Sequence, residues 1–380
     1  MTEPIALGQP TTGAEELAAV QAVFESGWLA GQGPAGREFE AAFARLVGAP
    51  HALAVNNCTA GLHLALLAMG VGPGDEVIVA DYTYPATGHA VLYCGARPRF
   101  ADVRADIWTI DVDAAAALVS DRTVGIVAVD SFGQCADYDE LRALTSRHGL
   151  FLVEDAACAA GATYHGTSAG NPALADVAAF SLHGRKGITS GEGGVVTTGS
   201  DDVAAFVAKR RSFGVESALS RAGSRDLPVP VFDELGWNYK LSDIGSAIAR
   251  VQVDRLPGLV EARRKTADRY QELLGDSDLV RTPVALEDRE HVWQSYVLTL
   301  DPAVDRDTMA VDLRDRGIGC NFGTFACNEQ PVYGDTDPCP VSSALFHHHL
   351  AIPMHANLNE EQVERVARDV LAAAAAAATR

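Results

Sequence analysis

The feature that most constrains the fold is a series of short apolar runs that alternate with helical or turn segments. Seven such runs cover residues 52–55, 76–80, 97–101, 124–129, 151–153, 177–181 and 195–198. Each run is too short for a buried helix, so the alternation predicts a mainly parallel seven-stranded sheet that helices cover on both faces. In sheets of this kind, ligands bind beyond the carboxyl ends of the strands.

A change of pattern after residue 199 indicates a second, smaller unit. The segment 209–230 is polar and predicts a long excursion. Beyond it the periodicity predicts helices at 242–255, 259–274, 307–316 and 360–378, with strands at 292–300 and 318–322. We therefore expect an α/β protein with a large domain at 1–250, including an N-terminal arm, and a smaller C-terminal α/β domain at 251–380.

Charge and cysteine content narrow the class of protein. A formal net charge of −20 argues against sequence-independent nucleic-acid binding, which needs clustered Lys and Arg. Seven cysteines without a CxxC pair favour a reducing cytoplasm over a disulfide framework. No apolar run approaches the ~18 residues of a membrane span, and the first residues lack a signal-peptide pattern, so we expect a cytoplasmic protein without membrane contact.

One lysine stands out from the others. The chain has only four lysines, and Lys209 and Lys265 lie in basic runs typical of solvated surface. Lys186 instead follows the apolar run that ends at Ser181 and is flanked by glycines and hydroxyl residues. Such residues let the backbone approach a phosphorylated cofactor. Lys186 is therefore the first candidate for covalent chemistry.

Polar residues at strand ends supply the other candidates. Asp155 ends a buried strand, where an unpaired charge is costly, so it is expected to meet a cation such as a protonated pyridine nitrogen. Lys186 would then react with a carbonyl of the same ring. Capping of a following helix by Asp155 is about equally consistent with the residues alone. Thr59, which precedes another helical segment, fits either a phosphate site or an ordinary cap.

These pieces together resemble one family over nearly the whole chain. In this order and spacing they are similar to the DegT/DnrJ/EryC1/StrS aminotransferases, which are fold-type-I (aspartate aminotransferase-like), pyridoxal-phosphate (PLP)-dependent enzymes that aminate keto sugars and keto cyclitols. The motifs that carry the resemblance are Ser26 to Leu29, Cys58 to Leu66, Asp81 to Thr87, Phe132 to Gln134, Glu154 to Ala157, Ser181 to Lys186, Gly191 to Gly194 and Gly236 to Asp243.

The resemblance implies a role for each matching residue. Lys186 would bind PLP covalently and later move a proton between substrate and cofactor, for which we expect its pKa to be lowered by desolvation and by Arg185. Asp155 would pair with the pyridine nitrogen, and Tyr84 would stack on the ring. Cys158 stands where many relatives carry Gln or His against the phenolic oxygen, and cysteine is a poor donor for that contact.

Further matches concern the phosphate, the partner subunit and the substrate. Thr59, the backbone of Ala60 and Ser181 match the phosphate cradle. Asn238 matches a residue that reaches the partner's phosphate, which implies a homodimer with shared active sites. Substrate contacts would come from Trp28, Lys240, Asn321 and Phe322. Two positions depart from the usual pattern: Asp130 stands where many relatives have histidine, and Lys240 where Arg is common, a change that is not neutral at a bidentate site.

The resulting hypothesis is an aminotransferase that transfers an amino group from L-glutamate or L-glutamine to a keto sugar, nucleotide-linked in the favoured version, or to a keto cyclitol. Its product would be an amino sugar for an antibiotic or another secondary metabolite, or for a surface polysaccharide. Alternatives are a related PLP-dependent dehydratase or deoxygenase, in which histidine replaces the lysine, and a non-catalytic PLP-binding regulator. Lys186 argues against both.

A histidine run offers a different kind of site. His347, His348 and His349 invite a metal hypothesis, but three consecutive side chains diverge and no second cluster has ligand spacing. We therefore predict a solvated turn there and no metal site.

Overall fold

All seven predicted strands form one central sheet in the computed structural model, which describes residues 3–215 and 231–378. The strand order is β1-β10-β9-β6-β5-β2-β4; the strands from β9 to β4 run parallel, and β10 runs antiparallel to both of its neighbours. The predicted mainly parallel α/β sheet is confirmed. Its strands are β1 (His51–Val55), β2 (Glu76–Ala80), β4 (Arg97–Ala101), β5 (Thr123–Val129), β6 (Phe151–Asp155), β9 (Val177–Ser181) and β10 (Gly194–Thr198).

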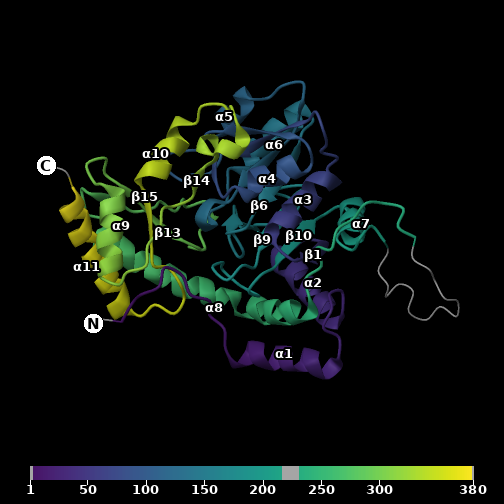
Figure 1. The fold of residues 1–380 in the computed structure, drawn as a ribbon, viewed down its shortest axis with the longest axis horizontal. Helices are drawn as coiled ribbons and strands as arrows, with labels where there is room; N and C mark the ends of the chain where they lie inside the picture. The colour runs from purple at the N-terminus through teal and green to yellow at the C-terminus, as the bar shows by residue number, and fades with distance from the viewer. Residues whose placement is uncertain (1–2, 216–230, 379–380) are drawn as a thin grey trace.

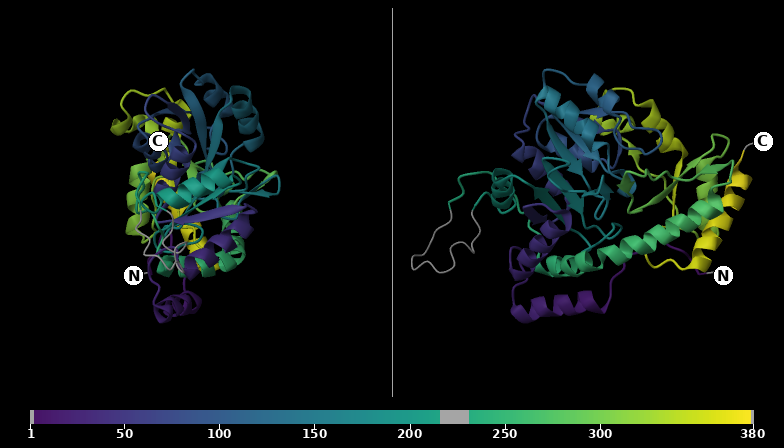
Figure 2. Two further views of the ribbon diagram at one scale, coloured as in Figure 1. Left: turned by 90° about the vertical axis from the view of Figure 1, so that its right-hand side faces the viewer. Right: turned by 180° about the vertical axis from the view of Figure 1, so that it is seen from behind.

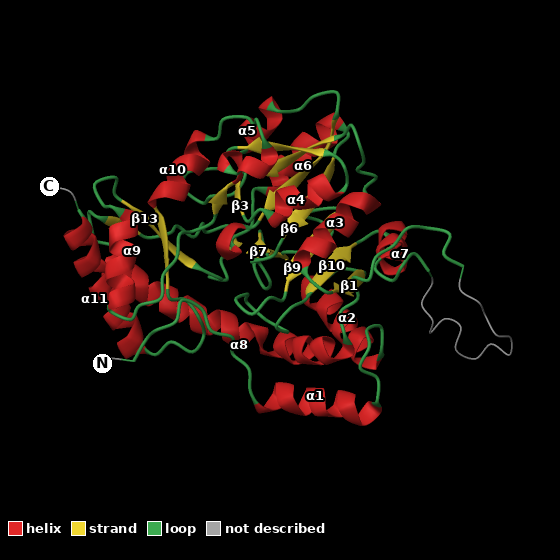
Figure 3. Cartoon of the chain, viewed as in Figure 1, coloured by secondary structure: helices red, strands yellow, loops and turns green. Residues whose placement is uncertain are grey.

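Helices cover both faces of this sheet. Successive residues of a strand point to opposite sides, so a strand that is apolar throughout needs a layer of helices on each face. In β2, Ile78 and Ala80 pack with α2, α5, α6 and α8, whereas Val77 and Val79 pack with α3, α4 and α7. The strands accordingly lie between helices in Figure 3. The helices are α1 (Ala14–Ser26), α2 (Pro34–Val47), α3 (Cys58–Ala68), α4 (Ala86–Tyr93), α5 (Val112–Ala117), α6 (Tyr138–His148), α7 (Asp201–Arg210) and α8 (Asp243–Leu274).

A second hydrophobic core joins residues from 267 to 377 with Ile5 of the N-terminal arm. It surrounds an antiparallel sheet of order β11-β13-β15 and lies at the end of the molecule where both termini are found (Figure 1). Its elements are β11 (Val280–Arg281), β13 (Tyr296–Leu300), α9 (Arg306–Asp315), α10 (Pro340–His348), β15 (His349–Ile352) and α11 (Glu360–Ala377). The domain boundary at residue 250 stays a prediction, since α8 crosses that position without a break.

Helix α8 links the two cores. It contacts α1 and α2 at one end and α11 at the other, and Figure 2 shows it running along the molecule from one unit to the other. The expectation of two helices, at 242–255 and 259–274, was wrong in this respect. Pro257 lies inside the single helix and is exposed. Proline has no N–H to donate to the helix, and here the missing hydrogen bond lies on the solvent side.

Two further predicted elements differ from the structure. The sequence pattern also predicts a helix from Thr83 to Tyr93, but the helix begins only at Ala86. Pro85 disfavours helical geometry in the residue before it, and Tyr82–Thr83 (β3) pairs instead with Phe325–Ala326 (β14). The strand expected at 318–322 is not formed; that segment makes only isolated bridges, from Ile318 to Ile5 and from Asn321 to Ala351. Minor elements are β7 (Thr163–Tyr164), β8 (Thr167–Ser168), β12 (Arg289–Glu290), η1 (Ser131–Gly133), η3 (Cys327–Glu329) and η4 (Pro331–Tyr333).

The histidine run is not the solvated turn that we predicted. His347 and His348 end α10, and His349 begins β15 and is fully buried. The Nδ1 atom of His349 lies 2.8 Å from the Tyr82 hydroxyl, and Nε2 lies 3.0 Å from Thr299 Oγ1. Burial lowers the pKa of His349 to about 3, so it is a neutral structural residue. Sequence reasoning missed it because its partners lie far away along the chain.

Candidate active site

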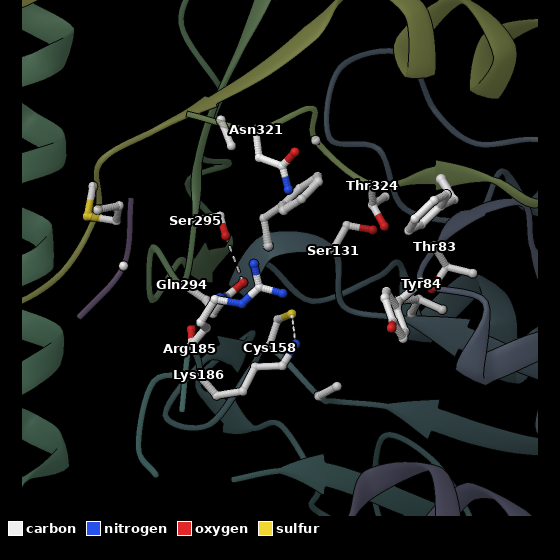
Figure 4. Close-up of a pocket in the computed structure, with 18 of the residues that line it drawn as sticks. Thr83, Tyr84, Ser131, Cys158, Arg185, Lys186, Gln294, Ser295, Asn321 and Thr324 are labelled. Carbon is white, nitrogen blue, oxygen red and sulfur yellow. Dashed lines mark hydrogen bonds between the residues drawn. The ribbon is translucent and has the colours of Figure 1, made fainter. Parts of the chain in front are cut away.

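A pocket opens beyond the carboxyl ends of β5, β6 and β9, where the second core faces the central sheet. This is the place expected for a ligand in an α/β sheet. The pocket brings together six of the predicted site residues, namely Tyr84, Asp155, Cys158, Lys186, Asn321 and Phe322. Figure 4 labels four of them, Tyr84, Cys158, Lys186 and Asn321. We call these six residues the pocket group.

Lys186 enters the pocket from the loop that follows β9. The loop is closed by backbone bonds from Lys186 N to His183 O (2.9 Å) and from Gly184 N to Gly191 O (3.0 Å). The Nζ atom donates a hydrogen bond of 3.1 Å to Cys158 Sγ, and the two side chains point toward each other in Figure 4. A contact with Cys158 was expected for the cofactor; the structure shows one with the lysine.

The Lys186 pKa is raised above its ordinary value by the surrounding protein groups, opposite to the expected lowering. Burial does act to lower the pKa of the amine, but Cys158, Cys58 and Asp155 act in the other direction and raise it overall. Of these neighbours Asp155 is a carboxylate, and a negative charge near an amine favours its ammonium form. The protein part of the site thus keeps Lys186 protonated.

Asp155 closes the pocket from the end of β6 and is 4% exposed. Its Oδ2 accepts a hydrogen bond of 2.7 Å from the Thr87 hydroxyl, and its Oδ1 accepts one of 3.1 Å from the Ala157 N–H. Burial raises the pKa of the carboxyl, while both hydrogen bonds and Lys186 oppose that shift. Turns rather than a helix follow Asp155, so the helix-cap alternative does not hold.

The opposite wall of the pocket is aromatic. The β3–β14 pairing places Phe325 beside Tyr84, with ring centroids 5.9 Å apart, and Phe322 packs on Phe325 at 5.0 Å. Tyr84 is 64% exposed, so its ring is open to a ligand. Asn321 lines the same side of the pocket. Whether Tyr84 stacks on a cofactor ring stays a prediction.

The predicted phosphate residues lie beside the pocket rather than in its lining. Thr59 and Ala60 belong to the first turn of α3, where the Ala60 N–H is donated to the capping Asn57 side chain at 2.8 Å. Ser181 pairs with Gly194 in the sheet, and a side chain at Gly194 would come within 2.8 Å of Cys58 N. Glycine at this position therefore lets the start of α3 approach β10, next to Ser181. The phosphate role of these residues stays a prediction.

Three predicted residues lie outside the pocket of their own chain. Asn238 is exposed, and its Oδ1 accepts a hydrogen bond of 2.6 Å from Lys240 Nζ, which also lies 4.6 Å from the Phe213 ring centroid. Trp28 is 38% exposed, in the turn between α1 and α2. We call Asn238, Lys240 and Trp28 the surface group.

Sequence reasoning missed two buried features of the site. The Thr87 hydroxyl donates a hydrogen bond to Asp155. The only sequence signal for a role of Thr87 was its position four residues after Thr83, whose hydroxyl it contacts. Asp130 and Glu154 form a buried carboxyl pair behind Asp155; burial raises the pKa of Asp130 to about 6 and that of Glu154 well above its usual value. The Oδ1 atom of Asp130 accepts hydrogen bonds from Tyr138 Oη (2.8 Å) and Ala136 N (2.9 Å).

Neither a metal site nor a membrane-spanning helix is found in the described part of the chain. Residues 3–215 and 231–378 hold no group of three or more His, Cys, Asp or Glu side chains arranged to bind a metal ion. No helix in these ranges combines the length and the apolar character that a bilayer crossing requires. All seven cysteines are free, and six of them are buried.

Comparison with known proteins identifies the kind of enzyme. Residues 10–371 match the sequence profile of the DegT/DnrJ/EryC1/StrS aminotransferase family. The chain belongs to this family. The GDP-perosamine synthase of Caulobacter vibrioides is 36% identical over 368 residues, which cover 95% of this chain and 96% of the relative. This chain is therefore a PLP-dependent aminotransferase with the fold-type-I architecture.

Solved structures agree over the full length of this aminotransferase. The aminotransferase TlmJ from Streptoalloteichus hindustanus superposes with a TM-score of 0.91 at 33% identity, covering 98% of this chain and 99% of TlmJ. Spr1654 of Streptococcus pneumoniae, solved in its PLP form, gives a TM-score of 0.92 at 26% identity and covers 99% and 100% of the two chains.

The residues of this aminotransferase fit PLP. Asp155 is a buried carboxylate whose hydrogen bonds, within the described residues, come from a hydroxyl and an amide rather than from a cation. A protonated ring nitrogen would supply the missing positive charge. The same pocket holds the Lys186 amine, which can react with an aldehyde. The pocket thus offers a carboxylate for the ring nitrogen and an amine for the aldehyde on the opposite side of the pyridine ring.

Proposed function

We propose that this aminotransferase transfers an amino group from L-glutamate or L-glutamine to a keto sugar, in the favoured case nucleotide-linked, or to a keto cyclitol. The observation that carries the proposal is the meeting of Lys186 and Asp155 in one pocket with an open aromatic wall. The relative named GDP-perosamine synthase supports a nucleotide-linked sugar as acceptor. The product would be an amino sugar for an antibiotic or a surface polysaccharide.

Each residue of the pocket has a task in this reaction. When bound, PLP supplies an electron sink for a carbanion beside the transferred nitrogen. Lys186 holds the cofactor and, once released from it, moves the proton at its Nζ atom to and from the reacting carbon. Asp155, oriented by Thr87, keeps the ring nitrogen protonated. Tyr84 and Phe325 cover the ring and the sugar with apolar surface, which excludes water.

We further infer that the active site is shared within a homodimer. Asn238 and Trp28 are exposed, Lys240 is half-buried, and all three lie outside the pocket of their own chain. Contact between Asn238 and the cofactor phosphate of a partner subunit would explain why Asn238 lies at the surface. Helix α1 also exposes Leu17 (72%) and Phe24 (59%), side chains that a partner could cover. Free cysteines agree with residence in a reducing cytoplasm.

Absorbance of the bound cofactor tests the proposal. Purified enzyme is titrated with L-glutamate and, separately, with L-glutamine, and the loss of the lysine-linked band is followed. Candidate keto sugars, with and without a nucleotide, are then added to restore the band. Restoration by a keto sugar is the expected result. No change with either donor would rule out the donor assignment, and restoration only by a 2-oxo acid would rule out the sugar acceptor.

A further inference from the structure

An arginine of helix α8 is buried next to the lysine loop without a negative partner. Arg263 is 6% exposed, and its Nη2 donates a hydrogen bond of 2.8 Å to the carbonyl of Gly187, the residue after Lys186. Its Nη1 is buried and has no hydrogen-bond partner, and no carboxylate of the described residues forms an ion pair with it. Burial alone lowers the pKa of the guanidinium to about 10, so it stays charged at neutral pH.

The same helix holds the loop at a second point. Gln252 is 1% exposed, and its Oε1 accepts a hydrogen bond of 3.2 Å from the backbone N–H of Thr189. Ile188, between the two held residues, is 1% exposed. The segment that follows Lys186 is therefore bound to α8 on both sides of a buried side chain.

The side chains of Gln252 and Arg263 approach the loop from opposite directions along α8, as their spacing shows. Gln252 and Arg263 are eleven residues apart, close to three helical turns, so they lie on one face of α8 about 16 Å apart along its axis. Gly187 and Thr189 are separated by at most about 7 Å. The two side chains must therefore converge on the loop, which limits its movement along the helix.

We propose that Arg263, assisted by Gln252, is a positioning residue for Lys186: it fixes the backbone that follows the lysine. The inference rests on the proposed function, in which Lys186 carries the cofactor. A buried arginine without a carboxylate is costly, and an apolar residue of similar size would serve stability better. The charge and the bond to Gly187 are what an apolar residue would lose.

Three variants separate this role from a structural one. Arg263→Met removes both the hydrogen bond and the charge, and Arg263→Lys keeps the charge and one donor. Arg264→Met is the matched control, since Arg264 is the next residue of α8, has a side chain 42% exposed and pairs with Glu261 at 3.3 Å. Each PLP-loaded enzyme is titrated with acid and base while the lysine-linked absorbance band is followed, and the half-reaction with L-glutamate is timed by stopped flow.

For Arg263→Met we expect the apparent pKa of the lysine-linked cofactor to shift away from the wild-type value, because the backbone that follows Lys186 is no longer held in place. The half-reaction should slow by about 10- to 100-fold with little change in the glutamate concentration needed, as a misplaced lysine predicts. Arg263→Lys should recover most of both effects, and Arg264→Met should match the wild type. Unchanged titration and rate in Arg263→Met would overturn the proposal, even if its melting temperature falls.

Two safeguards keep the test decisive. If Arg263→Met does not fold, Arg263→Gln makes a smaller polar change that also removes the charge, and wild-type titration and rate in that variant overturn the proposal equally. Borohydride reduction followed by peptide mapping shows which lysine carries the cofactor. A label on a lysine other than Lys186 refutes the proposed function, whereas a label on Lys186 with no effect of Arg263 refutes only the present inference.

Discussion

The pocket group and the surface group differ in whether a single chain brings their side chains into the pocket. Lys186 and Asp155 have their partners within the chain: a thiol for the amine, and a hydroxyl and an amide for the carboxylate. Asn238 and Lys240 are paired mainly with each other, near the surface. Both groups match motifs of one family, yet the pocket of a single chain takes in only the first. The residues proposed to react are thus brought together by the folding of one chain, whereas the role proposed for the surface group requires a second subunit.

The largest effect should come from the pocket group. Lys186→Ala removes the amine that holds the cofactor and moves the proton, so we expect the half-reaction with L-glutamate to slow by more than about 10³-fold. Stopped-flow absorbance measures the rate. Lys265→Ala, at a lysine whose side chain is 75% exposed, is the control and should be as fast as the wild type. A Lys186→Ala enzyme with a normal rate would contradict the assignment of the pocket.

A smaller loss of activity is expected from a change of Asp155. Asp155→Asn keeps the shape and the bond to Thr87 but cannot neutralise a protonated ring nitrogen, so kcat should fall by about 10²-fold. Steady-state kinetics with a fixed acceptor measure it, and Asp307→Asn on α9, 83% exposed, is the control. If kcat stays within a few-fold of wild type, Asp155 is not the partner of the ring.

The surface group is tested through cofactor affinity. Asn238→Ala should weaken PLP binding by about tenfold, the value of one hydrogen bond to a charged group. If Asn238 acts on the partner, mixing Asn238→Ala with Lys186→Ala protomers creates one site per mixed dimer in which both residues are intact, so wild-type PLP affinity should return at that site after exchange of subunits. No recovery in dimers shown to have exchanged would mean that the residue acts within its own chain, and the contrast between the two groups would disappear.

The smallest effect concerns the carboxyl pair behind the pocket. The folded-state pKa of Asp130, about 6, lies above the ordinary value of 3.8, so its contribution to stability is complete below pH 4 and is lost as the pH rises through 6. Asp130→Asn cannot lose a proton and should lack this step. Urea midpoints at several pH values between 4 and 7 measure it. Parallel profiles for the two proteins would show that Asp130 does not titrate in this range.

Local patterns were enough to locate the strands and the reacting residues. The seven runs are strands because short apolar segments between turn residues are too short to form buried helices. All seven pair in one sheet. Lys186 and Asp155 were found because each follows such a strand, where the carboxyl ends of parallel strands meet. The sequence by itself therefore determined the class of fold and the core of the site.

Tertiary structure decided the contacts between segments that are distant in sequence. Asp155 is oriented by Thr87, which is 68 residues away, and the Lys186 loop is held by Arg263, 76 residues from Gly187. His349 looked like part of a solvated run but is buried against Tyr82, 267 residues away. No periodicity encodes such pairs, because they depend on how complete elements pack against one another. The sequence names the residues that we propose to react, and the packing of complete elements such as α8 decides which side chains hold them in place.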